Sequence, residues 1–404
     1  MLRVLSVTEA REKVLASVAA CPVAEIVGIA GAVGRVLAGS LTAPGDLPPF
    51  ARATMDGYVV AARDTFGATE SMPALLTVAG EILMGCPSTV PLGSGQAVRI
   101  ATGGMLPAGG DAVVMVEHTE LLEARTVAVG RSVAPGENVI DCGEDLQAGE
   151  AVLPAGHRLR PQDSGVLAAL GYVTVAVNRR PRVALISTGD ELVPPETEPA
   201  PGQIRDANSA LLAALVRQAG AEPMLLGIVP DREEALFAVL QEAASLDCVI
   251  LSGGSSAGTR DLTATAIDRL GRPGVLFHGV SMRPGKPFIF GVVDNKPYFG
   301  LSGNPTSALV GFLLLVRPLL WQLAGAAEQP LWLSARVERS LSSASGREDY
   351  FRAYVYDQGG EFWAKPVMGQ AGLLSTMLRG NALLRIPQHC EGVEAGEKVA
   401  VLLL

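Results

Sequence analysis

The chain has 404 residues, 49% hydrophobic and 18% charged, so it is long enough for several domains and apolar enough to form packed cores. A formal net charge of −9 excludes a general binder of nucleic acid or of acidic membranes, although a few local cations can still hold a small anion. Five cysteines and four histidines are scattered without a Cys-x-x-Cys pair, which excludes a zinc knuckle or a disulfide framework and favours a reducing cytoplasm.

The first part of the chain predicts a helix, a break and a β-rich domain. Ser6 and Glu9 form a capping-box pattern ahead of an apolar stripe, which predicts a first helix. The small apolar segment 30–41 allows another helix, and prolines at 43–49 interrupt the pattern. Short alternating runs then predict strands at 78–82, 97–100, 112–116 and 126–129.

The middle of the chain alternates strands with helices, which predicts a parallel sheet with right-handed crossovers. A helix at 161–170 and a strand at 172–177 lead into it. Asp231 is expected to cap one of the helices, and Asp261 to open another. The expected strands are 183–187, 224–229, 248–251, 288–293 and 298–301, and the expected helices are 208–218, 233–244, one from 261 and one from 305.

The last part of the chain returns to short apolar runs, which predict a small β-barrel or sandwich. The N-terminus lacks the apolar core of a signal peptide. The longest apolar run, 308–320, is interrupted by Arg317 and Pro318 and is too short to span a bilayer, so no membrane span is expected. The expected C-terminal strands are 331–337, 350–356, 361–366, 382–386 and 398–403.

Glycine-rich turns between Asp247 and Pro305 indicate a ligand site. Three apolar runs in this stretch each end in such a turn, and loops at the carboxyl ends of strands bind ligands in open α/β sheets. Each turn alone fits an ordinary connection. Three of them, with Asp261, Arg283 and Lys286, favour an anion site. Asn304 as N-cap and Pro305 at the first helical position add free N–H groups that attract an anion.

Two loops of the β-rich domain also carry polar side chains. Asp56 stands before a glycine, and Thr102 stands before two glycines at the end of an expected strand. Taken one at a time, Asp56 is better explained by an ordinary Asp-Gly turn than by a binding site. Thr102 is likewise better explained by a hydroxyl that caps the local backbone.

A series of motifs runs through nearly the whole chain in a fixed order. Together they resemble the molybdopterin molybdenumtransferase family, called MoeA in bacteria and represented in animals by the E domain of gephyrin. Ser345-Gly-Arg347 with Phe351-Arg352 matches a pattern of that family's last domain. The other matching motifs are 48–50 with 55–58, 100–103, 111–114, 143–145, 187–192, 252–254 with 261, 284–287 and 303–305.

The resemblance implies a multidomain fold of the α/β plus β class and a homodimer with shared active sites. The implied parts are an extended dimerisation segment (1–45 and 144–180), a β-rich insert (46–143), a parallel-sheet α/β molybdopterin-binding domain (181–326) and a C-terminal β-barrel (327–404).

The resemblance also implies an activity, in which molybdenum from molybdate is inserted into adenylated molybdopterin and AMP leaves, with Mg²⁺ as the metal. The implied catalytic residues are Asp56, Glu191, Asp261 and Lys286, and the implied metal ligands are Asp190, Glu191 and Asp261. The implied substrate-binding residues are Thr102, Thr188, Gly189, Ser252, Gly253, Gly254, Arg283, Gly285, Gly303, Asn304, Pro305, Ser345 and Arg347.

The residues themselves suit this chemistry, because phosphates and an oxyanion need cations and helix N-termini, and Mg²⁺ needs carboxylate oxygens. Without the resemblance, Asp190 is better explained as a loop residue and Asp261 stays undecided. The chain departs from the family pattern in four places. Residues 140–142 stand where the family usually has basic residues. Arg283 stands where the family commonly has a lysine, Ser302 where it has a proline and Ala371 where it has a serine.

Two other functions stay open. A non-catalytic scaffold with the same fold is favoured slightly by the lost basic residues and Ala371, whereas Asp56, Thr102, Glu191, Asp261 and Lys286 favour the enzyme. A nucleotide pyrophosphatase is a third reading, and the insert and the C-terminal barrel argue against it.

Overall fold

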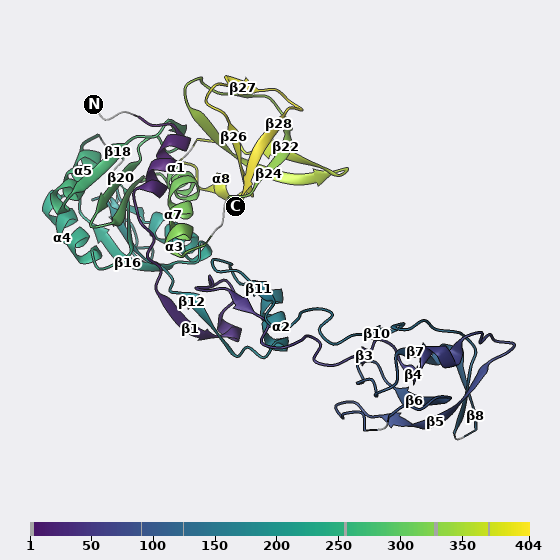
Figure 1. The fold of residues 1–404 in the computed structure, drawn as a ribbon. Coiled ribbons are helices and arrows are strands. Elements are labelled where there is room, and N and C mark those ends of the chain that lie inside the picture. The colour runs from purple at the N-terminus through teal and green to yellow at the C-terminus, as the bar shows by residue number, and fades with distance from the viewer. Residues whose placement is uncertain (1–3, 90, 124, 254–256, 327–329, 371) are drawn as a thin grey trace.

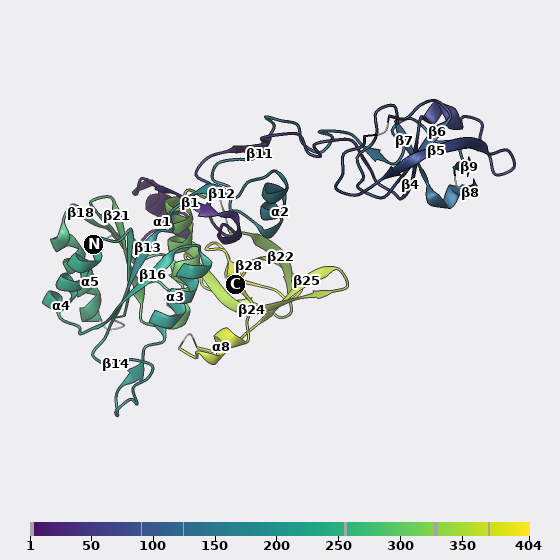
Figure 2. The same ribbon diagram turned by 90° about the horizontal axis from the view of Figure 1, so that it is seen from below.

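A computed structural model describes residues 4–89, 91–123, 125–253, 257–326, 330–370 and 372–404, and within helix α5 it describes side chains from Leu262 onward. The molecule is elongated (Figure 1). The α/β domain and the C-terminal barrel lie together at one end, a connecting piece follows, and the insert lies at the far end. Figure 2 shows the same separation from below, so the insert does not fold back onto its own α/β domain.

The α/β domain is built on a six-stranded sheet. Most neighbouring strands pair in parallel, but β20 runs antiparallel to both of its neighbours. A tight turn at Asp294 and Asn295, both at positive φ, connects β20 to β21 and explains this direction. The sheet is therefore mixed, rather than parallel throughout. In spatial order the strands are β16 (Glu222–Val229), β13 (Arg182–Thr188), β17 (Cys248–Gly253), β21 (Lys296–Ser302), β20 (Ile289–Val293) and β18 (Pro273–His278).

Helices bury apolar side chains on both faces of this sheet. On one face lie α4 (Glu233–Ala243) and α5 (Ala257–Leu270), and α5 starts four residues before the predicted start. Asp261 therefore lies inside this helix instead of opening it. On the other face lie α1 (Val7–Ala16), which begins with the predicted capping box, α3 (Asn208–Gln218) and a long helix from Pro305.

The long helix runs from Pro305 to Leu323 without interruption. By length and composition it is long and apolar enough to cross a membrane. The prediction that the apolar segment is too short to span a bilayer is therefore wrong for the whole helix. However, 72% of its most apolar stretch is buried inside the protein, as in the core helix of a globular domain. Its consecutive segments are α6 (Pro305–Gly311), a π-helical turn η4 (Phe312–Val316) and α7 (Arg317–Leu323).

The C-terminal domain is a barrel of five strands, all of them predicted, and pairing of β24 with β26 closes it. A strand of the α/β domain, β19 (Met282–Arg283), adds to β24 in parallel and joins the two domains. Around the barrel the strands are β24 (Glu348–Gln358), β25 (Glu361–Pro366), β22 (Trp332–Val337), β28 (Lys398–Leu403) and β26 (Ala382–Ile386). Smaller elements are β23 (Leu341–Ser342), β27 (Gly392–Val393) and α8 (Ser375–Leu378).

The insert contains a second six-stranded sheet, with the four predicted strands and two more. One of the additions, β4, starts directly after Asp56 and lies between two predicted strands. In spatial order the strands are β7 (Ala112–Met115), β4 (Gly57–Val60), β6 (Gln96–Ile100), β5 (Ala74–Ile82), β9 (Thr126–Val129) and β8 (Thr119–Glu123), with the 3-10 turns η2 (Ala62–Thr65) and η3 (Val116–His118).

The connecting piece consists of short paired strands and one helix. The helix allowed at 30–41 does not form: only a 3-10 turn, η1 (Ile29–Gly31), is present. Gly34 has a φ of 79°, which a helix excludes, and Val36 and Leu37 instead form isolated β-bridges with Arg158 and Val177. The elements are β1 (Ala24–Gly28) with β12 (Thr174–Asn178), β2 (Leu41–Thr42) with β11 (Ala151–Leu153), β3 (Arg52–Ala53) with β10 (Val139–Ile140), and α2 (Pro161–Ala169).

Candidate active site

A cavity of about 640 Å³ lies at the carboxyl edge of the α/β sheet. Its walls combine the ends of β13 and β17, the starts of α3 and α6, and the paired strands β14 (Leu192–Val193) and β15 (Ile204–Arg205). Gly372 and Leu374 of the C-terminal domain also reach it. Seven predicted site residues line this cavity: Thr188, Glu191, Ser252, Gly253, Gly303, Asn304 and Pro305.

The register of the parallel strands brings these residues together. Thr188 at the end of β13 lies opposite Gly253 at the end of β17, and Gly253 lies opposite Ser302 at the end of β21. Because the three strands end at one level, the loops that follow them meet at the same edge. The predicted meeting of these loops is thus a consequence of strand register, whereas their role in binding stays a prediction.

Gly253 stands where two backbones approach closely. Its φ is 150°, and an added Cβ would lie 2.0 Å from the Thr188 carbonyl oxygen. Both its conformation and its packing therefore require glycine. The absence of a side chain leaves the backbone of this strand end open to the cavity.

Asp231 has a different role from the predicted one. The sequence predicts it as the cap of α4, but Arg232 occupies that position. Asp231 instead accepts a 2.5 Å hydrogen bond from the Thr188 hydroxyl, and its N–H donates to the Asp190 carboxylate at 3.2 Å. Its place just after β16 is the signal from which sequence reasoning could have included it, since the other candidate loops also follow strands.

Carboxylates gather around the turn after β13. Glu191 folds back over Gly189, where an added Cβ would lie 2.7 Å from the Glu191 carboxylate, and Asp190 and Asp231 lie beside it. In the described part of the chain no three acidic, histidine or cysteine side chains lie close enough together to hold a metal alone. Two carboxylates still fit Mg²⁺, which takes one or two of them and keeps several waters.

Two predicted residues cannot be placed in this site. Gly254 and the side chain of Asp261 lie outside the described residues. Their assigned roles in substrate binding, catalysis and metal binding therefore stay predictions.

The start of α6 presents a helix N-terminus to the cavity. The predicted cap is confirmed, because the Asn304 side-chain oxygen accepts hydrogen bonds from the N–H groups of Thr306 and Ser307, and Pro305 holds the first helical position. The partial positive charge of a helix N-terminus favours an anion. This end of the cavity is suited to a phosphate.

The start of α3 forms the facing wall, through residues that the sequence analysis did not single out. The buried carboxylate of Asp206 accepts hydrogen bonds from the N–H groups of Asn208 and Ser209 and from the Ser209 hydroxyl. The Asn208 amide donates to the Gly303 carbonyl at 3.0 Å. The Asp206 bonds hold the start of α3, and the Asn208 bond ties it to the start of α6.

A smaller cavity of about 110 Å³ lies where β19 meets β24. Arg352 in its wall is 8% exposed and donates to the Gly369 carbonyl, while its Nε has no partner among the described residues. Burial lowers the pKa of the Arg352 guanidinium. The buried Asp349 carboxylate is held by Arg347 at 2.9 Å and by Arg283 at 3.8 Å. Two guanidinium groups therefore pair with this carboxylate, and Arg352 has no carboxylate partner among the described residues, which leaves positive charge for an anion.

Asp56 and Thr102 form a pair of their own in the insert. The Asp56 carboxylate accepts hydrogen bonds from the Thr102 N–H at 2.6 Å and from its hydroxyl at 2.7 Å. These bonds, the hydroxyl first, hold the pKa of Asp56 below its usual value, so the carboxylate stays ionised. Both residues are exposed, and the insert lies far from the α/β domain of the same chain in both views (Figures 1 and 2).

The remaining predicted residues lie outside both cavities. Lys286 is exposed in the turn before β20, and Ser345 is exposed before β24. Gly285 is buried, and an added Cβ would lie 2.9 Å from the Met282 side chain. The structure therefore does not bring these three into the walls of either cavity.

Comparison with known proteins assigns the chain to a family. Residues 5–171 match the MoeA N-terminal region (domain I and II), residues 184–322 a probable molybdopterin binding domain, and residues 334–404 the MoeA C-terminal region (domain IV). The chain is 35% identical to the molybdopterin molybdenumtransferase of Bacillus subtilis, over 94% of this chain and 90% of that protein. The chain belongs to the molybdopterin molybdenumtransferase family. A family member from Nostoc is 38% identical over 94% of this chain and 88% of its own length.

Solved structures of the family share the whole architecture. Two structures of the molybdopterin biosynthesis MoeA protein from Pyrococcus horikoshii have TM-scores of 0.83 and 0.86, with 37% and 34% sequence identity. They cover 99% and 100% of this chain and the same shares of their own chains. The predicted multidomain fold is therefore confirmed.

Proposed function

We propose that this protein inserts molybdenum from molybdate into adenylated molybdopterin and releases AMP. Relatives that span the chain bear the name molybdopterin molybdenumtransferase, and the domain that holds the main cavity matches a probable molybdopterin binding domain. The cavity volume of about 640 Å³ lies within the range of sites for ligands of this size. Phosphate groups would lie at the start of α6, beside Gly253.

The observation that carries the molybdate part of this proposal is the buried cation in the smaller cavity. Arg352 is almost fully buried, has no carboxylate partner among the described residues and keeps its Nε unpaired. A buried charge without a partner is costly, so an anion that pairs with it would be stabilised. Molybdate is an oxyanion that can accept several hydrogen bonds from the guanidinium groups of Arg352 and Arg283.

Mg²⁺ is part of the proposal, with Glu191, Asp190 and Asp261 as the residues that would hold it. When bound, it would neutralise phosphate charge and make the anhydride easier to cleave. Asp231 would orient the turn that carries two of these residues, through its bonds to Thr188 and Asp190.

A homodimer with shared sites is also proposed. Asp56 is exposed in an insert that stands away from its own cavity, so it is available to a site on another chain. Ile26 and Val173, which are 75% and 76% exposed on the connecting piece, give an apolar surface for a partner subunit. The five cysteines are all unpaired, and we propose a cytoplasmic location.

The test is a purified-protein assay with adenylated molybdopterin, molybdate and Mg²⁺, scored by AMP release. We expect release to require both molybdate and Mg²⁺. Equal release in the presence of a chelator would overturn the metal assignment. Tight binding of the adenylated pterin without any AMP release would instead support the non-catalytic scaffold.

A further inference from the structure

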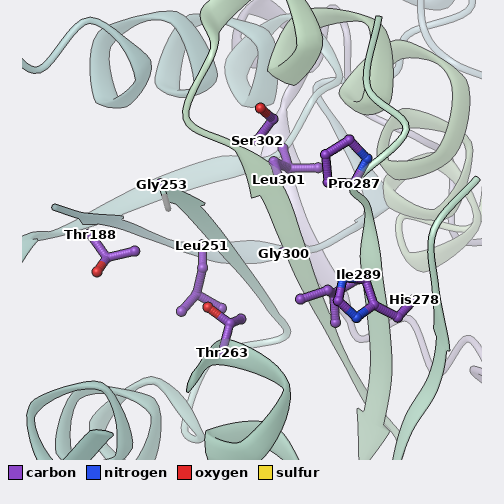
Figure 3. A pocket seen from close by; sticks show the side chains of 10 residues that line it. All are labelled: Thr188, Leu251, Gly253, Thr263, His278, Pro287, Ile289, Gly300, Leu301 and Ser302. Carbon is purple, nitrogen blue, oxygen red and sulfur yellow. The ribbon is translucent and has the colours of Figure 1, made fainter. Parts of the chain in front are cut away.

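The wall of the main cavity contains a single cationic residue among those that the structure describes. Its charged residues are the acidic Glu191 and Asp206 and the basic Arg205. At the strand ends the wall consists of Thr188 and Gly253, which also line the neighbouring pocket drawn in Figure 3 and carry no charge. Phosphate oxygens form their strongest hydrogen bonds with cationic groups, and Arg205 is the side-chain cation that this wall offers them.

Arg205 lies close to two parts of the candidate site. In its own strand, the N–H of Ile204 donates to the Glu191 carbonyl at 2.8 Å, which places Arg205 beside the turn that carries the acidic residues. Three residues farther along the chain, the Asn208 amide donates to the Gly303 carbonyl at 3.0 Å. Three residues span at most roughly 11 Å, so a long arginine side chain at this position is within reach of a phosphate at the start of α6.

The Arg205 guanidinium is held by the loop that precedes it. Its Nε donates to the Pro195 carbonyl at 3.0 Å, and a terminal nitrogen donates to the Glu198 carboxylate at 2.7 Å. Both partners belong to segment 194–203, which connects β14 to β15 and protrudes from the α/β domain in Figure 2. The Glu198 side chain is 91% exposed and that of Arg205 is 48% exposed. Because an ion pair this open to solvent contributes little to stability, a phosphate can replace Glu198 easily.

We propose that Arg205 binds a phosphate of the adenylated substrate, and that Glu198 occupies the guanidinium while the cavity is empty. The proposal rests on the proposed function, to which it adds a substrate-binding residue and an internal competitor. Arginine suits this exchange, because its planar fork can donate two parallel hydrogen bonds to a phosphate as it does to a carboxylate. The phosphate would then lie between Arg205 and the N–H groups at the start of α6.

The first test is calorimetric binding of the adenylated pterin to the full-length protein, without molybdate and with a chelator so that no AMP is released. Arg205→Gln should raise Kd by roughly 10- to 100-fold, because hydrogen bonds to a charged group are lost. Glu198→Gln should lower Kd by about two- to fivefold, because the competing carboxylate is gone. The tighter binding separates competition from a structural role, since loss of a purely structural ion pair would not improve binding.

A double substitution tests whether both effects act through the same guanidinium. In the Arg205→Gln background, Glu198→Gln should leave Kd unchanged, because no guanidinium remains for which Glu198 competes. The matched controls are Arg269→Gln and Glu234→Gln. These two residues form an exposed ion pair of the same length, 2.7 Å, in the same domain, and neither lines the cavity. Both controls should leave Kd unchanged.

Three results would overturn the proposal. An unchanged Kd in Arg205→Gln would remove Arg205 from the phosphate site. Unchanged or weaker binding in Glu198→Gln would show that Glu198 does not compete. Tighter binding that persists when Glu198→Gln is added to Arg205→Gln would assign the effect to general repulsion between Glu198 and the anion.

Failure of this proposal can be told from failure of the proposed function. If the unchanged protein does not bind the adenylated pterin, the proposed function fails and this proposal falls with it. If the unchanged protein and Arg205→Gln bind the pterin equally well, only this proposal fails.

Discussion

At the scale of single residues, the candidate site is marked by charged groups that the protein leaves incompletely paired. The Nε of Arg352 and one carboxylate oxygen of Asp349 are buried without a hydrogen-bond partner among the described residues. Such groups raise the free energy of the folded state unless a ligand pairs with them. Of the two, the Arg352 guanidinium is the group with which an anion would pair.

Arg352→Gln tests this interpretation. The substitution keeps a long polar side chain but removes the charge, so the molybdate concentration that gives half-maximal AMP release should rise by at least about tenfold. This corresponds to the loss of a charge-assisted hydrogen bond of roughly 1.5–3 kcal/mol. Arg379→Gln, at an exposed position of the same domain, should change nothing. A molybdate dependence that is unaltered in Arg352→Gln would place the oxyanion elsewhere.

Asp231→Asn tests the carboxylate that the sequence analysis assigned to helix capping. The amide oxygen can still accept the Thr188 hydrogen bond, so stability should change by less than about 1 kcal/mol. Loss of the negative charge beside Asp190 should lower kcat by at least about tenfold. Glu123→Gln on the insert is the control. A large fall in melting temperature with normal kcat in the folded fraction would mean that Asp231 is structural.

At the scale of elements, an ionised carboxylate stabilises the N-terminal end of helix α2. The buried carboxylate of Asp163, in the first turn of α2, accepts hydrogen bonds from the backbone and guanidinium of Arg160 and lies 2.6 Å from the His157 imidazole. The Arg160 guanidinium is the main cause that holds the pKa of Asp163 well below its usual range, and His157 adds to it. The connecting piece is therefore stabilised by an ionised carboxylate at this helix start.

The lowered pKa of Asp163 predicts that the free energy of unfolding depends on pH. Because the pKa of Asp163 is lower in the folded state, its contribution is fully present above the unfolded value of about 3.9 and is lost as the pH falls through the folded value. Asp163→Asn should lower the free energy of unfolding by about 1.5–3 kcal/mol at neutral pH. Urea unfolding at several pH values should show this difference shrink at strongly acid pH. A difference that stays constant with pH would contradict the ionic role.

At the scale of the whole molecule, the insert and the α/β domain of one chain stand apart (Figure 1). The chain segments between them pair as two short antiparallel strand pairs, β2 with β11 and β3 with β10. The ionised Asp56 therefore has no ligand site within its own chain among the described cavities. A two-fold dimer could place it over the cavity of the partner subunit, and would then contain two identical shared sites.

Mixed dimers test this arrangement. Homodimers of Asp56→Asn and of Glu191→Gln should each be nearly inactive, because every shared site lacks one carboxylate. In a mixed dimer one site carries both substitutions and the other carries neither. Random re-pairing of equal amounts should therefore restore activity to about a quarter of all sites. If subunits exchange and no activity returns, Asp56 does not complete the partner's site.

The sequence by itself determined the local elements and the family. All five barrel strands, the helix at Asn208–Gln218 and the Asn304 cap follow from periodicity and capping, which depend on neighbours a few residues away. Errors arose where the chain was judged on such local signals alone, and two of them show the reason. Segment 30–41 looked helical but is held by pairing with distant strands, and Asp231 looked like a helix cap but bonds to Thr188, 43 residues away.

Only the tertiary structure decided which side chains meet. Strand register placed Thr188, Gly253 and Ser302 at one level, and the pairing of β19 with β24 brought Arg283 to Asp349 across a domain boundary. No local period encodes these meetings, because they depend on the register and packing of segments that are far apart in the chain.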